Sequence, residues 1–184
     1  MIEVFNFVFR FFSKLKRLSN LAAAKKEGLK IGPRSILVGD QAFGSEPFLI
    51  QIGSDCLITN NVKFITHDGS IQVPLIKEGE HIHKVYSKKS VFDRIQIGDN
   101  VFIGVDSIIL PGTIVGSNTI IGAGSVVKGI YPANSVVSGN PARVTKSLDE
   151  YYKKQSGKIV LMRSGSKRKE LILGSLPMSS KMDS

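Results

Sequence analysis

The stretch IGDNVFIGVDSIILPGTIVGSNTIIGAGSVVK, residues 97–128, repeats with a period of six. An aliphatic residue opens each hexad, glycine often follows it, and a small or β-branched residue stands at the fifth position. The opening residues are Ile97, Ile103, Ile109, Val115, Ile121 and Val127, and the fifth-position residues are Val101, Ser107, Thr113, Thr119 and Ser125. This period matches neither the 3.6 residues of an α-helical turn nor the two-residue alternation of a simple strand.

A short flat strand followed by a tight corner explains a six-residue repeat, and three such units close one triangular coil of about 18 residues. Stacked coils line up the aliphatic residues inside the prism, and Gly or Asn at the corners tolerates positive φ. The same phase begins at Ile31, Ile52 and Ile58. We therefore predict an all-β core, a left-handed parallel β-helix of hexapeptide repeats over residues 28–146, whose hand departs from the usual right-handed crossover.

Composition fits a protein with one sizeable folded core. The chain has 184 residues, 42% of them hydrophobic and 22% charged, which argues against wholesale disorder. No apolar run reaches the roughly 20 residues of a membrane-spanning helix, so a polytopic membrane protein is excluded. Cys56 is the one cysteine, which excludes an internal disulfide framework and a cysteine-cluster zinc site. We expect its thiol to be a buried small side chain rather than a nucleophile.

The formal net charge of +10 is carried by the two ends of the chain. Residues 1–30 contribute +5 and residues 147–184 contribute +4, whereas residues 31–146 contribute only +1. A nucleic-acid-binding domain usually carries its positive charge on the folded body. We therefore expect no nucleic-acid partner.

Residues 1–27 form a separate N-terminal segment. Phe5, Val8, Phe12, Leu15 and Leu18 share one stripe at helical spacing, which predicts an amphipathic helix over residues 2–26 that ends near glycine 28. Two interpretations are open. The helix packs on the rest of the fold or on a neighbouring subunit, or it lies in an anionic membrane surface as a peripheral contact.

The repeat is interrupted by a protruding loop, residues 68–95. Long excursions from a rigid scaffold commonly carry function, and the three histidines, His67, His81 and His83, stand at or within this interruption. His67 directly follows a predicted strand, so the scaffold can position its ring as a general base. We expect His81 and His83 to be solvated loop residues, and we expect no metal site.

The residues beyond the core, 147–184, begin with SLDEYYKKQ. Ser147 followed by Glu150 three residues later predicts a capped short helix. The rest mixes basic and apolar residues, so the segment reads as a C-terminal helix and tail that either packs on a neighbour or stays partly disordered.

Three motifs resemble one family. GAGSVV at 122–127, SGNPAR at 138–143 and ITHDG at 65–69 are similar to the hexapeptide-repeat O-acetyltransferases, which include maltose and galactoside acetyltransferases and sugar acetyltransferases of capsule and O-antigen polysaccharide biosynthesis. The resemblance covers about residues 28–146. It implies a homotrimer of left-handed β-helices that binds acetyl-CoA between neighbouring prisms and needs no metal.

The resemblance also assigns candidate site residues. It makes His67 the catalytic base, and it places Glu46 in acceptor binding or in orienting His67. Asp68 is a second carboxylate near the base, with a turn-capping role as its alternative. The positions that correspond to acetyl-CoA contacts are Gly104, Val105, Gly122, Ala123, Lys128 and Arg143.

We therefore expect an acetyl-CoA-dependent O-acetyltransferase of the cytoplasm, at the inner face of the membrane if the N-terminal helix binds lipid. The acceptor is expected to be a sugar hydroxyl on a polysaccharide, a lipid-linked glycan or a nucleotide sugar. His67 would act by a direct ternary-complex mechanism. Two alternatives remain. One is an acetyltransferase acting on an amino sugar, an amino acid or a xenobiotic such as chloramphenicol, and the other is a β-helical scaffold without enzymatic activity.

Overall fold

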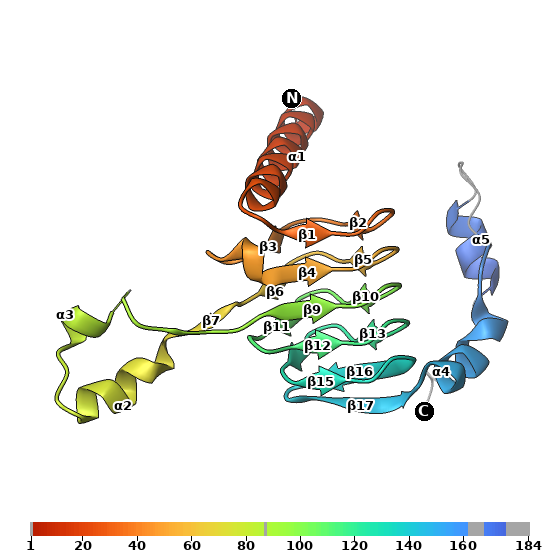
Figure 1. Cartoon of the computed structure of the whole chain (residues 1–184). Helices are drawn as coiled ribbons and strands as arrows, with labels where there is room; N and C mark the ends of the chain where they lie inside the picture. Colours follow the sequence, from red (N-terminus) through yellow and green to blue (C-terminus); the bar gives the residue numbers. More distant parts are fainter. Residues whose placement is uncertain (1, 87, 162–167, 176–184) are drawn as a thin grey trace, which may run out of the picture. The chain divides into compact units, whose positions relative to one another are not determined.

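The computed structural model describes residues 2–86, 88–161 and 168–175, and its core is a three-sided prism of stacked parallel strands (Figure 1). Sheet A contains β1 (Lys30–Ile31), β4 (Ile50–Ile52), β9 (Ile95–Ile97), β12 (Ile114–Val115) and β15 (Ile130–Tyr131). Sheet B contains β2 (Ile36–Leu37), β5 (Leu57–Ile58), β10 (Phe102–Ile103), β13 (Ile120–Ile121), β16 (Ser135–Gly139) and the antiparallel β17 (Ala142–Ser147). Sheet C contains β3 (Gln41–Ala42), β6 (Val62–Phe64), β11 (Ile108–Ile109) and β14 (Val126–Val127).

The chain visits sheets A, B and C in turn, which is the left-handed parallel β-helix predicted from the hexads. Regular coils have the predicted pitch: the Asp99 N–H donates to Ser117 Oγ, 18 residues on. Between the second and third coils the pitch lengthens to 45 residues, as in the Ser54 N–H bond to Asp99 Oδ1. The additional residues are the excursion that interrupts the repeat.

The prism interior is formed by the residues predicted to fill it. The hexad-opening residues Ile97, Ile103, Ile109, Val115, Ile121 and Val127 are all buried. The fifth-position hydroxyls are buried as well and donate to nearby carbonyl oxygens, for example Ser107 Oγ to Gly104 O at 2.7 Å. Among the described residues every buried side-chain nitrogen or oxygen has a hydrogen-bond partner, so these polar atoms do not destabilise the core.

At the corners, positive φ and the regular spacing of glycine have separate causes, which the sequence analysis treated as one. Positive φ occurs at the fourth hexad position, where Asp55, Asn100 and Asn118 have φ between 52° and 59°. The second-position glycines have a different cause, because a Cβ at Gly116 would lie 2.4 Å from Ala133 N of the next coil. These glycines allow consecutive coils to approach closely.

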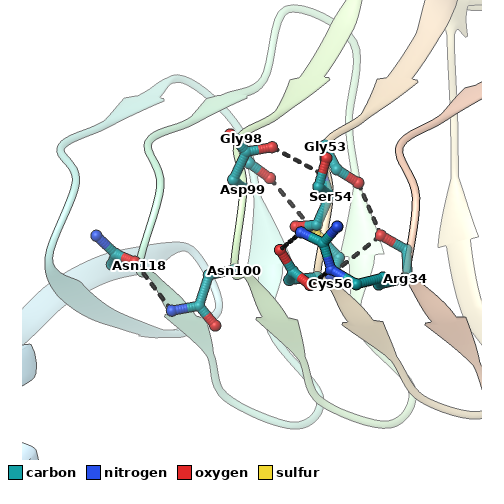
Figure 2. A network of polar contacts seen from close by, with 10 residues as sticks. Arg34, Gly53, Ser54, Cys56, Gly98, Asp99, Asn100 and Asn118 are labelled. Carbon is teal, nitrogen blue, oxygen red and sulfur yellow. Dashed lines mark hydrogen bonds and ion pairs between the residues drawn. The ribbon is translucent and has the colours of Figure 1, made fainter.

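Polar side chains join the coils along the corner between sheets A and B (Figure 2). The Asn100 amide donates to Asn118 Oδ1 at 2.9 Å, and Asn118 donates in turn to Asn134 Oδ1 at 3.1 Å. On the first two coils the Arg34 guanidinium donates two hydrogen bonds to the Asp55 carboxylate, forming a bidentate ion pair. The corner therefore carries a ladder of side-chain contacts that runs parallel to the backbone ladder.

Outside the prism, the predicted N-terminal helix is confirmed as α1 (Ile2–Lys26), and Gly28 beyond it has a φ of +102°. The excursion is an antiparallel ribbon of β7 (His67–Asp68) and β8 (Val91–Phe92) that carries η2 (Gly69–Ile71), α2 (Gln72–Lys77) and α3 (Ile82–Val85). A further short helix, η1 (Pro47–Leu49), lies between β3 and β4.

Residues 149–184 form a second compact unit. The predicted short helix is α4 (Leu148–Gln155), followed by η3 (Ser156–Lys158) and by α5 (Arg168–Ser175), which the sequence analysis did not predict. The expectation for the tail beyond α5 lies outside the described residues.

Replacing Gly116 by alanine tests the close approach of the coils. The added methyl group would collide with backbone of the next coil, so Gly116→Ala should lower stability by about 1–3 kcal/mol. The matched control is Gly124→Asn, because Gly124 has φ +66° and open space around its Cα. Thermal unfolding should show a clear loss for the first variant and a change within about 0.5 kcal/mol for the second. Equal midpoints would contradict the steric explanation.

Candidate active site

His67 stands where the excursion leaves the second coil. It follows β6 by two residues and begins the ribbon strand β7, where it is the register partner of Phe92 on β8. A backbone hydrogen bond from Asp93 N to Thr66 O at 3.1 Å joins the two ends of the excursion, which are its roots, where the chain leaves and re-enters the prism. The imidazole ring lies 5.8 Å from the Phe92 ring, centroid to centroid. Both roots therefore fix the position of His67.

A carboxylate stands beside the imidazole. His67 Nδ1 lies 2.9 Å from Glu46 Oε2, and the buried Thr66 hydroxyl donates to the same oxygen at 2.6 Å. Glu46 and His67 are 21 residues apart, which is also the spacing of Arg34 and Asp55 on the first two coils. Glu46 therefore lies one coil from His67 because the helical pitch places it there.

Hydrogen bonding keeps Glu46 ionised. Partial burial alone would raise the pKa of its carboxyl group. The hydrogen bonds from Thr66, His67 and Ser45 outweigh this effect and hold the pKa of Glu46 below its ordinary value. A carboxylate only accepts hydrogen bonds, so the partner atom, His67 Nδ1, carries the hydrogen and Nε2 has the free lone pair.

The segment before Glu46 explains why this side chain reaches the site. Gly44 has φ +64°, which turns the chain after β3, and the buried Pro47 begins η1 immediately after Glu46. The Glu46 carbonyl then accepts a bond from Leu49 N at 3.0 Å. A tight turn and a short helix thus hold Glu46 on both sides, with 17% of its side chain exposed against 39% for His67.

The structure gives Asp68 the turn-capping geometry. Asp68 Oδ1 accepts from Ser70 N at 2.8 Å at the start of η2, and these bonds lower the pKa of Asp68. The orienting contact to His67 belongs to Glu46 and not to Asp68. Lys128 follows β14, which lies in sheet C with the strand β6 that precedes His67, so both residues stand where the chain passes from sheet C to sheet A.

Four of the residues assigned to acetyl-CoA lie on one corner, where the chain passes from sheet B to sheet C. They are Gly104, Val105, Gly122 and Ala123, on consecutive coils, and Gly124 N donates to Val105 O at 2.8 Å. The glycines are required for packing: a Cβ on Gly104 would lie 2.4 Å from Ala123 N, and a Cβ on Gly122 would lie 2.8 Å from Ser138 Cβ. Their presence alone is therefore no evidence for a ligand.

Arg143 continues this corner. It lies on β17 as the register partner of Ser138, the residue that Gly122 packs against, and its side chain is exposed. Lys128 lies elsewhere, just after β14, where the chain passes from sheet C to sheet A. One chain therefore holds its candidate residues at two corners. The C-to-A corner has His67, Glu46, Asp68 and Lys128, and the B-to-C corner and the adjoining β17 have Gly104, Val105, Gly122, Ala123 and Arg143.

The remaining candidates have structural roles. His81 caps α3 through a bond from His83 N at 3.4 Å, and the two rings stack 5.1 Å apart. Cys56 is buried with its thiol 3.2 Å from Gly98 O, and burial raises its pKa, which makes it a poor nucleophile. The sequence analysis missed Thr66 and Phe92. The position of Thr66 directly before the candidate base was the one available signal.

The chain is similar to known hexapeptide-repeat proteins. Residues 94–129 match the family described as bacterial transferase hexapeptide (six repeats). Protein CapG of Staphylococcus aureus is 43% identical over 143 residues, which are 77% of this chain and 78% of that protein. A maltose O-acetyltransferase structure from Clostridium difficile 630 is 26% identical with a TM-score of 0.53, covering 75% of this chain and 84% of that chain.

A structure of galactoside acetyltransferase in complex with coenzyme A is 22% identical with a TM-score of 0.52, covering 76% of this chain and 84% of that chain, and it supports the fold. The family match, the extent of the CapG similarity and the shared coil architecture agree. The chain therefore belongs to the bacterial hexapeptide-repeat transferases, the acetyltransferase family that its sequence resembles.

Proposed function

We propose that this protein is an O-acetyltransferase that moves an acetyl group from acetyl-CoA to a hydroxyl group of a sugar. The observation that carries the proposal is the hydrogen-bonded pair of Glu46 and His67, fixed one coil apart at the root of the excursion. Family membership supplies the transferase class, and the maltose O-acetyltransferase, at 26% identity, supports a sugar acceptor and an acetyl donor. The cytoplasm is the compartment that provides acetyl-CoA.

In the proposed mechanism His67 is the general base. Its Nε2 accepts the proton of the acceptor hydroxyl as that oxygen bonds to the carbonyl carbon of the thioester. When the C–S bond breaks, the same Nε2 returns the proton to the leaving sulfur, so ester and free CoA thiol form together. The ionised Glu46 holds Nδ1–H and stabilises the imidazolium that forms between these steps. Acceptor and donor must be bound together, because the buried Cys56 does not serve as an acyl carrier.

The small residues of the B-to-C corner support donor binding there. Val105 and Ala123 are exposed on consecutive coils at this corner, and the small Ala123 side chain leaves room beside the backbone for an extended pantetheine arm. The exposed Arg143 guanidinium continues the line and suits a phosphate group. Lys128 lies at the C-to-A corner, as His67 does, so we assign it to the acceptor side of the site.

Outward-facing side chains support a homotrimer. At the sixth hexad position the prism carries apolar residues that a single chain leaves partly exposed, including Ile36, Phe102, Ile114 and Ile130. Apolar patches of this kind favour contact between subunits. The division of the candidate residues between two corners of one chain also favours a homotrimer. Packing the B-to-C corner of one copy beside the C-to-A corner of the next would unite His67 with the donor-binding row.

Loss of the base should remove most of the catalytic rate. His67→Ala is expected to lower kcat by about 10²–10⁴-fold without changing the oligomeric state. CoA release from acetyl-CoA, detected as free thiol with a panel of nucleotide sugars and oligosaccharides, measures the effect. Cys56→Ala is the control and should retain nearly full activity. Undiminished turnover by the His67 variant would eliminate this mechanism.

Replacing Glu46 by glutamine tests its positioning role. Glu46→Gln keeps the shape but removes the negative charge that faces the imidazole, and a hydrogen bond to a charged group is worth about 1.5–3 kcal/mol. We expect kcat to fall about 10–100-fold with little change in the KM for acetyl-CoA. Asp55→Asn is the control and should leave kcat unchanged, because it removes a carboxylate that pairs with Arg34 at the same 21-residue spacing but away from His67. A change confined to KM would show that Glu46 binds substrate instead.

Arg143 is expected to act on donor binding alone. Removal of one charge-assisted contact in Arg143→Ala should raise the KM for acetyl-CoA about 10–100-fold while kcat stays constant. The control is Lys146→Ala, which removes a positive charge from the same strand. With 3′-dephospho-acetyl-CoA the difference between wild type and Arg143→Ala should disappear. If the difference persists with the dephosphorylated donor, Arg143 does not bind the 3′-phosphate.

A further inference from the structure

Helix α1 is attached to the β-helix near its C-terminal end. Ala24 is buried, and Leu21 packs against the hydrophobic core cluster together with the buried Leu29 that follows the helix. Nearer the N-terminus the large apolar residues are exposed, with exposed fractions of 57% for Phe11, 62% for Phe12, 54% for Leu15 and 50% for Leu18. These four apolar side chains therefore have much of their surface without a partner in the described part of the chain.

The exposed apolar face is centred on the side of α1 that points away from the β-helix, and Leu18 lies at its border, where it also lines the cavity beside the first coil. Successive residues of an α-helix are about 100° apart, so Ala24, nine residues after Leu15, lies on the opposite side of the helix axis. Phe11, Phe12, Leu15 and Leu18 together span an arc of about 120° centred near Leu15. The β-helix occupies the other side through Ala24 and Leu21. A closing motion onto the β-helix would have to give up that buried contact.

The same helix carries a concentrated positive charge. Residues 2–26 contain six basic residues and one acidic residue, which gives a net charge of +5. Residues 31–146 are nearly neutral. The basic residues are Arg10, Lys14, Lys16, Arg17, Lys25 and Lys26. Broad apolar surface and many basic residues on one helix are the features of a helix that lies in an anionic lipid surface.

A cavity beside the helix has the same mixed lining. It has a volume of about 350 Å³ and lies between α1 and the first coil. Arg17 and Lys25 contribute cationic groups, whereas Leu18, Leu21 and Phe43 contribute apolar surface. The side of α1 that turns toward the β-helix is thus also suited to anionic amphiphiles.

We infer that α1 binds the surface of an anionic lipid bilayer, with Phe11, Phe12, Leu15 and Leu18 inserted at the boundary between headgroups and acyl chains. None of the helices in the described ranges is long and apolar enough to cross a membrane, so the contact is peripheral. A second copy of the chain is a poorer occupant. The interface of a coiled coil covers a narrower stripe of the helix than this arc. Packing copies of α1 together would also bring helices that each carry a net charge of +5 into contact, and they would repel one another. The inference does not depend on the proposed enzymatic activity.

The test is co-sedimentation of the full-length protein with vesicles. Wild type should bind vesicles of phosphatidylcholine and phosphatidylglycerol, should bind pure phosphatidylcholine weakly, and should be released by salt. Phe12→Ser/Leu15→Ser should reduce binding to the anionic vesicles at least about ten-fold. Both side chains are exposed, so the variant should keep the thermal midpoint and the elution volume of the wild type.

The matched control is Val73→Ser/Ile76→Ser, which removes two exposed apolar side chains from α2 in the excursion. It should bind vesicles as wild type does. Absence of wild-type binding, or equal binding by the α1 variant, would overturn the inference. A shift of the α1 variant to a smaller oligomer without vesicle binding by wild type would make the face a subunit contact.

Discussion

The close stacking of consecutive coils is the constraint on which the rest of this structure depends. A Cβ on Gly104 or Gly116 would lie 2.4 Å from a backbone nitrogen of the next coil, so the coils leave no room for a side chain at these corners. Tight stacking fixes the register, and the register places equivalent hexad positions above one another along the prism. The aliphatic stack, the buried hydroxyls and the asparagine ladder are consequences of this alignment.

The candidate site uses the same alignment at the place where the repeat is broken. The first two coils are spaced by 21 residues, and that spacing brings Glu46 beside His67. The excursion then leaves the prism immediately after the base, and its two roots pair again as β7 and β8. A rigid solenoid can thereby hold one imidazole and one carboxylate in fixed geometry while the excursion supplies surface for an acceptor. Pre-organisation of this kind is what general-base catalysis requires.

The sequence predicted what repeats and did not predict what occurs once. The period of six determined the prism, its interior and the position of His67 at the root of the excursion. The short helices of the excursion have no periodic signal. The contact of Glu46 with Thr66 and His67 depends on a local lengthening of the coil, so the repeat did not indicate it and the family resemblance was what pointed to Glu46. The resemblance explains the glycines at 104 and 122 through a ligand, although close packing between coils requires them. A glycine in the sequence therefore does not distinguish close packing between coils from ligand binding, because both require a residue without a side chain.

The placement of α1 bears on the choice of acceptor. The helix runs directly into β1 of the first coil, and His67 belongs to the second coil, one strand spacing of about 4.8 Å further along the prism. A bilayer bound through α1 would therefore lie near the end of the prism that carries the candidate base. A glycan attached to a lipid keeps its sugar close to that surface, whereas a free nucleotide sugar gains nothing from it. The two proposals rest on different residues, and together they favour a lipid-linked glycan as the acceptor.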